Sequence, residues 1–154
     1  MRSLVAALIV CASVAACATN PDLDANTRTA KRVFFEKMGE GRFDKLDEIY
    51  GPAFVAHGAT RDYTLEQDNE SGKIWRAAFP DLKVMVDRTA ASNDLVAVHW
   101  HATGTNTVAA GGMPGKGAKA SMEGMTFFRF VDGRIVEEWS VLDMLRLREQ
   151  LGQF

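Results

Sequence analysis

The dominant hydrophobic period of the chain changes near Pro80 from helical to alternating, and this change constrains the fold more than any other feature. Before Pro80, apolar residues recur at helical spacing, as in Ala30, Val33, Phe34 and Met38. After Pro80, apolar and polar residues alternate, which is typical of strands buried on one side. Helices followed by a long run of strands predict an α+β domain, with the helices on one face of a curved antiparallel sheet.

We expect helical segments before and after the strands, at residues 27–38, 43–50, 64–79 and 143–150. The expected strands span residues 53–57, 82–90, 95–105, 118–131 and 135–141. Asp132-Gly133, between the last two strands, is a two-residue hairpin signal. The glycine-rich residues 111–117 lack the Gly-Lys-Ser/Thr ending of a phosphate-binding loop, so we expect a hairpin loop that could act as a lid.

The first residues predict an exported protein. Arg2 precedes an apolar run that is too short to span a bilayer, which is typical of a signal peptide. The run ends in Val14-Ala15-Ala16-Cys17, which resembles the lipobox of bacterial lipoproteins, where the cysteine is acylated. An ordinary signal peptide followed by a coincidental cysteine is the alternative.

This interpretation divides the chain into three parts: a signal peptide at 1–16, a tether at 17–26 and a domain at 27–154. Ala18, rather than Asp, follows Cys17, and by resemblance to enteric lipoproteins this favours the periplasmic face of the outer membrane. The lipid on Cys17 would anchor the domain to the cell envelope.

Composition excludes some classes of protein. The 154 residues suffice for one domain, and 47% hydrophobic with 25% charged residues is globular rather than disordered composition. A net charge of -2 without a basic run argues against nucleic acid binding, which depends on neutralising phosphates. Cleavage would leave Cys17 as the single cysteine, so no internal disulfide is expected.

Sequence words typical of one family follow each other along residues 28–152. They span residues 32–36, 43–50, 54–57, 77–82, 96–100, 104–105, 128–130, 132–143 and 150–152. Their order and spacing resemble the SnoaL-like polyketide cyclases, also called ester cyclases, of the nuclear transport factor 2-like superfamily.

The resemblance implies a cone-shaped, curved antiparallel sheet wrapped around N-terminal helices and enclosing an apolar pocket. It implies ring closure by an intramolecular aldol reaction without cofactor or metal, in which one Asp acts as acid and base. The family motif Trp-x-x-x-Asp falls on Trp139 and Asp143. The superfamily also contains proteins that bind ligands without catalysing a reaction. Its members often dimerise through the open sheet face, so this chain could form a homodimer.

Asp143 is also a reasonable acid/base on physical grounds. On an extended strand, Trp139, Val141 and Asp143 share one face. If that face enters the pocket, its apolar neighbours desolvate the carboxylate and raise its pKa toward neutrality. The alternative is that Asp143 only caps the final helix, since Asp is a favoured N-cap residue.

The histidines are further candidates. By the resemblance, His57 lines the pocket and orients a substrate carbonyl or water; alternatively it is a strand-end histidine bonded to a loop. His99 and His101 share a strand face opposite Val96, Val98 and Trp100. They could begin a zinc site if Glu123 or His57 completed it, but two ligands do not define such a site, so no metal is predicted. Alternatively, the two histidines make the pocket polar, or they lie on a polar sheet face that packs in a dimer.

The remaining candidates are expected to wall a lipophilic cavity. They are Phe34, Phe54, Trp75, Phe79, Trp100, Met125 and Trp139. Of Glu137 and Glu138, only one can face inward, and parity with Trp139 and Asp143 favours Glu137. An inward Glu137 would need a partner such as Arg129, because an unpaired buried carboxylate is costly.

Two functions fit these residues. The first is a cofactor-independent cyclase, isomerase or hydratase that acts on a small lipophilic carbonyl compound through Asp143. The second is a non-catalytic binder of a small lipophilic molecule at the cell envelope, with Asp143 purely structural. The ligand itself is not given by the sequence under either interpretation.

Overall fold

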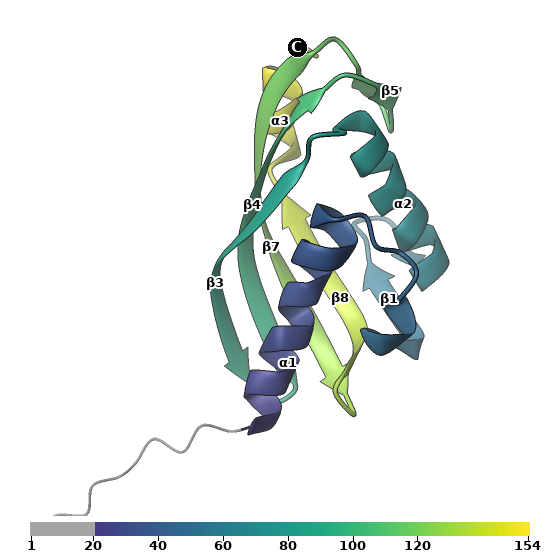
Figure 1. Ribbon diagram of the computed structural model, residues 1–154, viewed down its shortest axis with the longest axis vertical. Coiled ribbons are helices and arrows are strands. Elements are labelled where there is room, and N and C mark those ends of the chain that lie inside the picture. The colour runs from purple at the N-terminus through teal and green to yellow at the C-terminus, as the bar shows by residue number, and fades with distance from the viewer. Residues whose placement is uncertain (1–20) are drawn as a thin grey trace, which may run out of the picture.

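A computed structural model describes residues 21–154 (Figure 1). The predicted signal peptide and Cys17 lie outside the described residues. Helix α1 (Pro21–Arg32) begins earlier than expected, so residues 21–26 of the predicted tether are helical. Asp22 and Asp24 in the first turn favour this start, because negative charge stabilises a helix N-terminus.

Helix α1 runs directly into η1 (Val33–Gly39), which is wound as a π-helix. The prediction of a helix at 43–50 is wrong, because only the 3₁₀ turn η2 (Leu46–Glu48) forms there. Strand β1 (Tyr50–His57) follows at once, so Pro52 lies inside a strand rather than stopping a helix. It is tolerated because the register of β1 shifts between Tyr50 and Val55.

Helix α2 (Leu65–Ala78) confirms the helix expected at 64–79. Thr64 caps it: the Thr64 hydroxyl accepts the Gln67 N–H, and the Gln67 side chain accepts the Thr64 N–H. The short strand β2 (Asp62–Tyr63) precedes this cap and pairs with the end of β1.

The main sheet has six strands in the order β2-β1-β8-β7-β4-β3. Its long members are β3 (Lys83–Ser92), β4 (Leu95–Asn106), β7 (Ala118–Val131) and β8 (Arg134–Leu142). Strand β1 pairs parallel to β8, so the sheet is mixed rather than fully antiparallel as expected. The α+β class with N-terminal helices on a curved sheet is confirmed.

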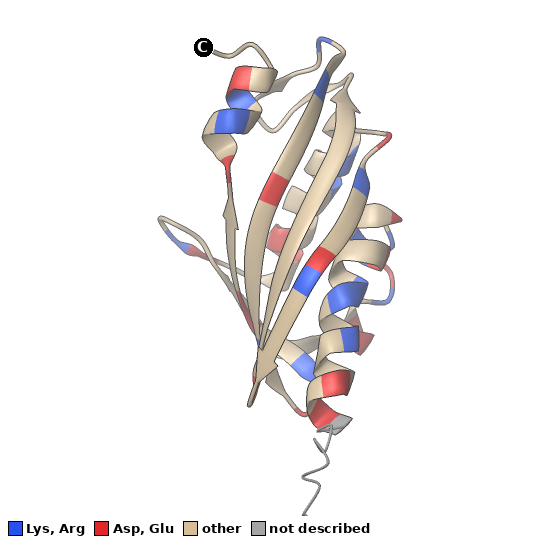
Figure 2. Cartoon of the chain, turned by 90° about the vertical axis from the view of Figure 1, so that its left-hand side faces the viewer, with Lys and Arg blue, Asp and Glu red and all other residues tan. Residues whose placement is uncertain are grey.

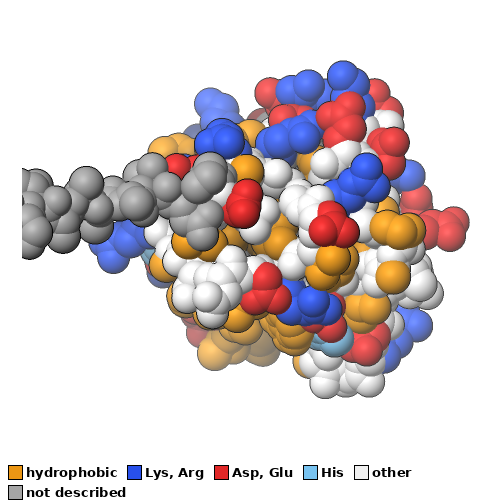
Figure 3. Space-filling view, turned by 90° about the horizontal axis from the view of Figure 1, so that it is seen from below, with side chains coloured by type: hydrophobic (Ala, Val, Ile, Leu, Met, Phe, Trp, Pro, Cys, Tyr) orange, Lys and Arg blue, Asp and Glu red, His pale blue; other side chains and the backbone are white. Residues whose placement is uncertain are grey.

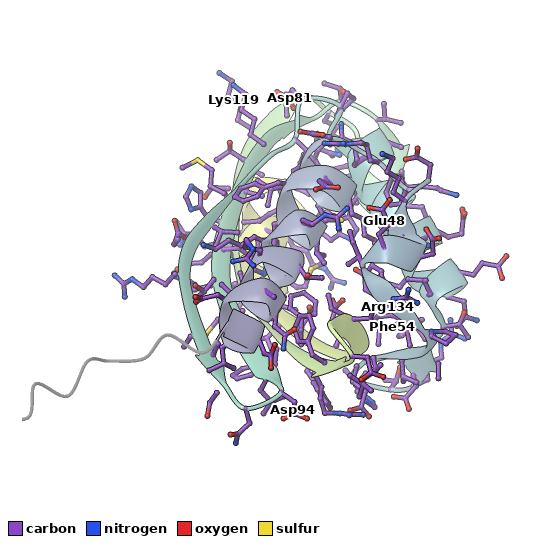
Figure 4. All side chains as sticks on the ribbon, turned by 60° about the horizontal axis from the view of Figure 1, so that its bottom comes forward. Glu48, Phe54, Asp81, Asp94, Lys119 and Arg134 are labelled. Atoms are coloured by element: carbon purple, nitrogen blue, oxygen red, sulfur yellow. The ribbon has the colours of Figure 1, made fainter. Side chains whose placement is uncertain are left out.

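Helices α1 and α2 lie against the concave side of this sheet (Figures 1 and 4). In Figure 4, Asp94 marks the β3–β4 turn, and Phe54 lies on the side where β1 pairs with β8. One core cluster, around Phe34, Phe54 and Phe128, fills the space beneath α1. A second cluster packs Phe79 and Met122 against helix α3 (Met144–Gln150).

A small hairpin, β5 (Ala109–Ala110) with β6 (Met113–Pro114), occupies the predicted loop at 111–117. Asn106 is fully buried and ties this hairpin down. Its amide donates to the carbonyls of Ala78 and Val108 at 3.0 and 3.2 Å, and its Oδ1 accepts the Gly115 N–H at 2.7 Å. These bonds fix the hairpin to the end of α2 rather than leaving it a free lid.

Charged residues are concentrated on the helices, while the long strands carry few of them (Figure 2). Seen from the end at which α1 begins, hydrophobic side chains are also exposed between the charged ones (Figure 3). Within residues 21–154, no helix is both long and apolar enough to cross a bilayer.

Candidate functional site

A cavity of about 190 Å³ lies between the helices and the concave face of the sheet. Helices η1 and α2 supply one wall, and the four long strands supply the other. Its lining is mostly apolar, with a polar group at one side. The lining residues are Val33, Phe34, Lys37, Met38, Asp68, Ser71, Gly72, Trp75, Leu82, Val84, Trp100, Ala102, Met122, Thr126, Glu138, Ser140 and Leu142.

Lys37 is the buried cation of this cavity, with 2% of its surface exposed. Its ammonium group forms a salt bridge with Asp68 of α2 and donates to the Tyr50 hydroxyl at 3.2 Å. The π-helical winding of η1 presents Lys37 here, and such windings are frequent at functional sites. Burying a charge is costly even when it is paired, so a buried lysine in a cavity wall favours a functional role.

Glu138 of β8 ends a chain of hydrogen bonds along the cavity wall. The Trp100 indole N–H donates to Thr126 Oγ1 at 3.1 Å, and the Thr126 and Ser140 hydroxyls bond at 2.9 Å. The Ser140 hydroxyl then donates to Glu138 Oε1 at 2.8 Å. The chain crosses three neighbouring strands and holds the Glu138 carboxyl in one orientation.

The environment of Glu138 raises its pKa to about 7. Desolvation by the surrounding protein is the largest cause, and the nearby Asp68 carboxylate adds to it. The Lys37 charge and the Ser140 hydrogen bond oppose this shift. Glu138 is therefore partly protonated near neutral pH, as a group that both takes and returns a proton must be.

Gly124 of β7 allows the Trp100 ring to lie flat against the sheet. A Cβ at position 124 would come within 2.5 Å of Trp100 Cζ2, closer than atoms can approach. The Trp100 ring is therefore held by the bare backbone on one side and by its bond to Thr126 at the edge. Phe34 packs against it, with ring centroids 5.7 Å apart.

Three of the predicted pocket residues line the cavity: Phe34, Trp75 and Trp100. Phe54 and Phe79 are buried in the two core clusters but do not line it. The predicted separation of faces on β4 is confirmed, since Val96 and Val98 are buried on the inner side.

The sequence predicted that β8 turns the face of Glu137 and Trp139 into the cavity. This prediction is wrong, because the opposite face of β8 lines the cavity. Glu138, Ser140 and Leu142 point inward, whereas Glu137, Trp139 and Val141 point outward. A β-bulge causes this: Arg129 pairs with Glu137 but Phe130 pairs with Ile135, so Val136 is an extra residue. One extra residue exchanges the two faces of the strand beyond it.

Asp143 lies outside the cavity, as the N-cap of α3. Its Oδ1 accepts the Arg146 backbone N–H at 3.0 Å, and the residue is exposed. Asp143 does not have the apolar surroundings expected from the sequence, because Trp139 and Val141 beside it face outward. The acid/base role that the resemblance implies for Asp143 stays an untested prediction.

His57 also lies on the outer side of the sheet. Its ring stacks on Trp139 with centroids 4.7 Å apart, and its Nδ1 lies 3.0 Å from Asp62. Glu137 lies on the outer face rather than the inner one, and there its carboxylate pairs with Arg129. The Arg129 guanidinium holds the pKa of Glu137 below its usual range.

His99, His101 and Met125 are likewise outside the cavity, contrary to expectation. His99 Nε2 lies 2.8 Å from Glu123, and His101 Nδ1 lies 2.8 Å from Asp87. Asp87 is the extra residue of a second bulge, in β3. Among the described residues, no group of three or more His, Cys, Asp or Glu side chains is arranged to hold a metal ion.

Several residues of the cavity were not candidates at the sequence level: Lys37, Asp68, Thr126, Glu138 and Ser140. Lys37 gave one usable signal, since it lies one turn after Phe34 on the apolar side of its helix. For Glu138 the sequence pointed the other way, because parity with Trp139 and Asp143 favours Glu137 as the inward residue.

A model of the family described as SnoaL-like polyketide cyclase matches residues 28–151. The chain belongs to the SnoaL-like family. No functionally curated protein matches the chain.

Solved structures agree with this assignment. IdmH, a putative polyketide cyclase from Streptomyces antibioticus, shares 28% identity at a TM-score of 0.72, over 82% of this chain and 98% of that one. A putative polyketide cyclase from Acidithiobacillus ferrooxidans shares 26% identity at a TM-score of 0.73, and the match covers 84% of this chain and 95% of that one. AclR, a putative hydroxylase from Streptomyces galilaeus, has the same fold, with a TM-score of 0.77 and 23% identity. The match covers 86% of this chain and 98% of that one.

Proposed function

We propose that this SnoaL-like protein catalyses proton transfer on a small lipophilic carbonyl compound without a cofactor, using Glu138 as acid and base. The observation that carries the proposal is the carboxyl of Glu138, with a pKa of about 7, in an apolar cavity that also holds the buried ammonium of Lys37. A base with a pKa near the working pH combines proton affinity with a useful fraction of the ionised form.

The two groups divide the chemistry between them. Ionised Glu138 takes a proton from the carbon next to the carbonyl, and the C–H electron pair moves into the enolate. The enolate oxygen accepts an N–H from Lys37, whose charge compensates the charge that develops there. Asp68 and Tyr50 hold the Lys37 ammonium in place for this contact.

Glu138 then returns the proton. In a β,γ-unsaturated ketone the enolate is conjugated with the C=C bond, and return of the proton to its γ-carbon isomerises the compound. If the enolate carbon instead attacks another carbonyl of the same molecule, Glu138 protonates the new alkoxide and a ring closes. Both routes conserve electrons and consume no co-reactant, so the residues of the cavity suffice for either.

Deuterium exchange tests this proposal without knowledge of the natural product. The protein is incubated in D2O with a panel of small cyclic ketones, and loss of the α-proton signal is followed by NMR. We expect exchange that rises with pH through about 7, and a loss of roughly 100-fold or more in Glu138→Gln, since a positioned base contributes that much.

Glu137→Gln is the matched control, because its side chain is the neighbouring carboxylate on the outer face. We expect it, and Asp143→Asn, to exchange at the wild-type rate. Wild-type exchange in Glu138→Gln, or its loss in Asp143→Asn, would contradict the proposal and favour the acid/base that the family motif implies.

The second candidate is a binder of a small lipophilic molecule. The position of Asp143 as a helix cap outside the cavity favours it, because binding needs only the cavity. Ligand binding without α-proton exchange on any ketone of the panel would support this function instead.

We also propose that the protein is exported and anchored through a lipid on Cys17. The lipobox-like residues 14–17 support this proposal. A Cys17→Ser precursor should lose incorporation of labelled palmitate and should move from the membrane to the soluble fraction. If the variant stays in the membrane fraction, the anchor is not Cys17.

A further inference from the structure

We propose that the cavity selects a neutral, oxygen-bearing ligand of about one ring and rejects fused ring systems. The inference deepens the proposed function, since it names the class of carbonyl compound that Glu138 would act on. It rests on the volume of the cavity, the rigidity of its walls and the balance of charge inside it.

The volume sets the size of the ligand. An apolar cavity of about 150 Å³ holds one benzene molecule. The present cavity, at about 190 Å³, has room for a six-membered ring with about two substituent atoms, or about 8 non-hydrogen atoms by the same proportion. A compound of three or four fused rings exceeds this space.

The walls leave little room for expansion. Trp100 is fixed between Gly124 and its hydrogen bond to Thr126, and Phe34 packs against it. Trp75, on the side of α2, stacks on Phe79 with ring centroids 6.0 Å apart. Interiors packed this closely do not absorb an additional ring without displacing side chains.

The groove next to the cavity does not continue its apolar lining unbroken. A neighbouring groove shares Ser71 and Trp75 with the cavity, so a longer ligand would leave past these residues. Beside the apolar residues Ile74, Met113 and Met144, the groove is lined by polar and charged side chains, namely Arg61, Glu66, Gln67 and Glu70. A flat apolar ring system gains little by lying against them.

The charges select a neutral ligand with an acceptor. Lys37 is already neutralised by Asp68, and ionised Glu138 adds a second carboxylate, so an anionic ligand is repelled. The Lys37 ammonium has three N–H donors, of which two have partners in Asp68 and Tyr50. The third is available to a ligand oxygen in the cavity that Lys37 lines.

Calorimetric titration with a graded series tests the inference. The probes are 3-methylcyclohex-2-enone with one ring, 2-tetralone with two, anthrone with three, and cyclohexanecarboxylate as the charged single ring. We expect the single-ring enone to bind at least tenfold more tightly than the two-ring ketone or the carboxylate, and anthrone to show no saturable binding. Equal or tighter binding of anthrone, or no binding of the enone, would overturn the inference.

Two methionine variants on β7 test whether a larger cavity binds a larger ligand. Met122 is buried and lines the cavity, so Met122→Ala should enlarge it and bind 2-tetralone at least tenfold more tightly than the wild type does. Met125→Ala, three residues along but on the exposed outer face, should leave every affinity unchanged. An equal effect of the two variants would count against selection by cavity size.

The two proposals fail separately. If the size series holds but no ketone exchanges its α-proton, the ligand class stands and the proposed catalysis fails. If exchange occurs and depends on Glu138 while anthrone binds like the enone, the catalysis stands and the size limit fails. Because the wild-type series alone decides the size limit, poor folding of a variant does not remove the test.

Discussion

At the scale of single residues, two adjacent glutamates have opposite environments. Glu138 is desolvated in the cavity wall, and its pKa is raised to about 7. Glu137 lies outside beside Arg129, and its pKa is lowered. The difference follows from the alternation of side chains along a strand, which sends neighbours to opposite faces. Of the two carboxyl groups, only Glu138 has a pKa close to neutral pH.

The raised pKa of Glu138 predicts how stability depends on pH. Its pKa is about 7 in the folded protein, against an ordinary value of 4.5, so the native state binds more protons between these values. Its favourable contribution is fully present below pH about 4.5 and is lost as pH rises through about 7. Relative to Glu138→Gln, the wild type should lose on the order of 2 kcal/mol between those limits. Urea unfolding of both proteins across this range measures the difference.

Glu137→Gln gives the opposite sign and serves as the control. Because the pKa of Glu137 is lowered, its contribution is present above its ordinary pKa and is lost as pH falls through the lowered value. A difference between the wild type and Glu138→Gln that stays constant with pH would contradict the assignment.

At the scale of secondary structure, the bulge in β8 decides which residues form the site. Regular pairing outward from the Asp132-Gly133 turn would set Phe128 opposite Glu137, and Glu137 would then share the buried face of Phe128. The extra residue Val136 sets Phe128 opposite Glu138 instead. Hydrophobic pattern did not reveal this, because the outward face of β8 carries Trp139 and Val141 and is the more apolar of the two.

The remaining elements were more predictable. Thr64 with Gln67 signals the start of α2, and strict alternation signals β4 and β7, so these came directly from the sequence. The parallel pairing of β1 with β8 and the π-helical winding that turns Lys37 into the cavity depend on tertiary packing. Local pattern does not encode such features, which is why the inner polar group was missed.

The β5–β6 hairpin supplies a prediction at this scale. Asn106→Ala removes three hydrogen bonds and leaves the buried Ala78 carbonyl with one partner fewer. We expect a loss of roughly 2–4 kcal/mol in the free energy of unfolding, because buried groups without partners are costly. Hydrogen exchange measured by NMR should also show a faster rate for the Gly115 N–H, whose acceptor is removed. An unchanged exchange rate at Gly115 would mean that Asn106 does not anchor the hairpin.

At the scale of the whole molecule, the two faces of the sheet carry different kinds of group. The concave face encloses Lys37 and Glu138 in an apolar cavity. The outer face exposes large apolar side chains and bears the histidines; the apolar members are Met85, Met125, Phe127, Trp139 and Val141. Exposed apolar side chains in such a group are typical of a surface that is covered by a partner. The expected homodimer stays a prediction.

The family assignment covers the whole domain, whereas the chemistry depends on a few side chains inside it. One scaffold of this kind supports different reactions, so membership alone does not select one. The cavity of this chain differs from the expectation based on the family motif, because its poised carboxyl is Glu138 rather than Asp143. The proposed catalysis therefore depends on the protonation of Glu138.

A carboxyl titration measures that protonation most directly. Protein labelled with ¹³C at the glutamate side-chain carboxyl is titrated by NMR from pH 3 to pH 9, as the wild type and as Glu138→Gln. One resonance of the wild type should titrate near pH 7 and should be missing in the variant. If every glutamate resonance titrates below about pH 5, or if the resonance near pH 7 persists in Glu138→Gln, Glu138 is not the carboxyl with the raised pKa and the proposed catalysis is contradicted.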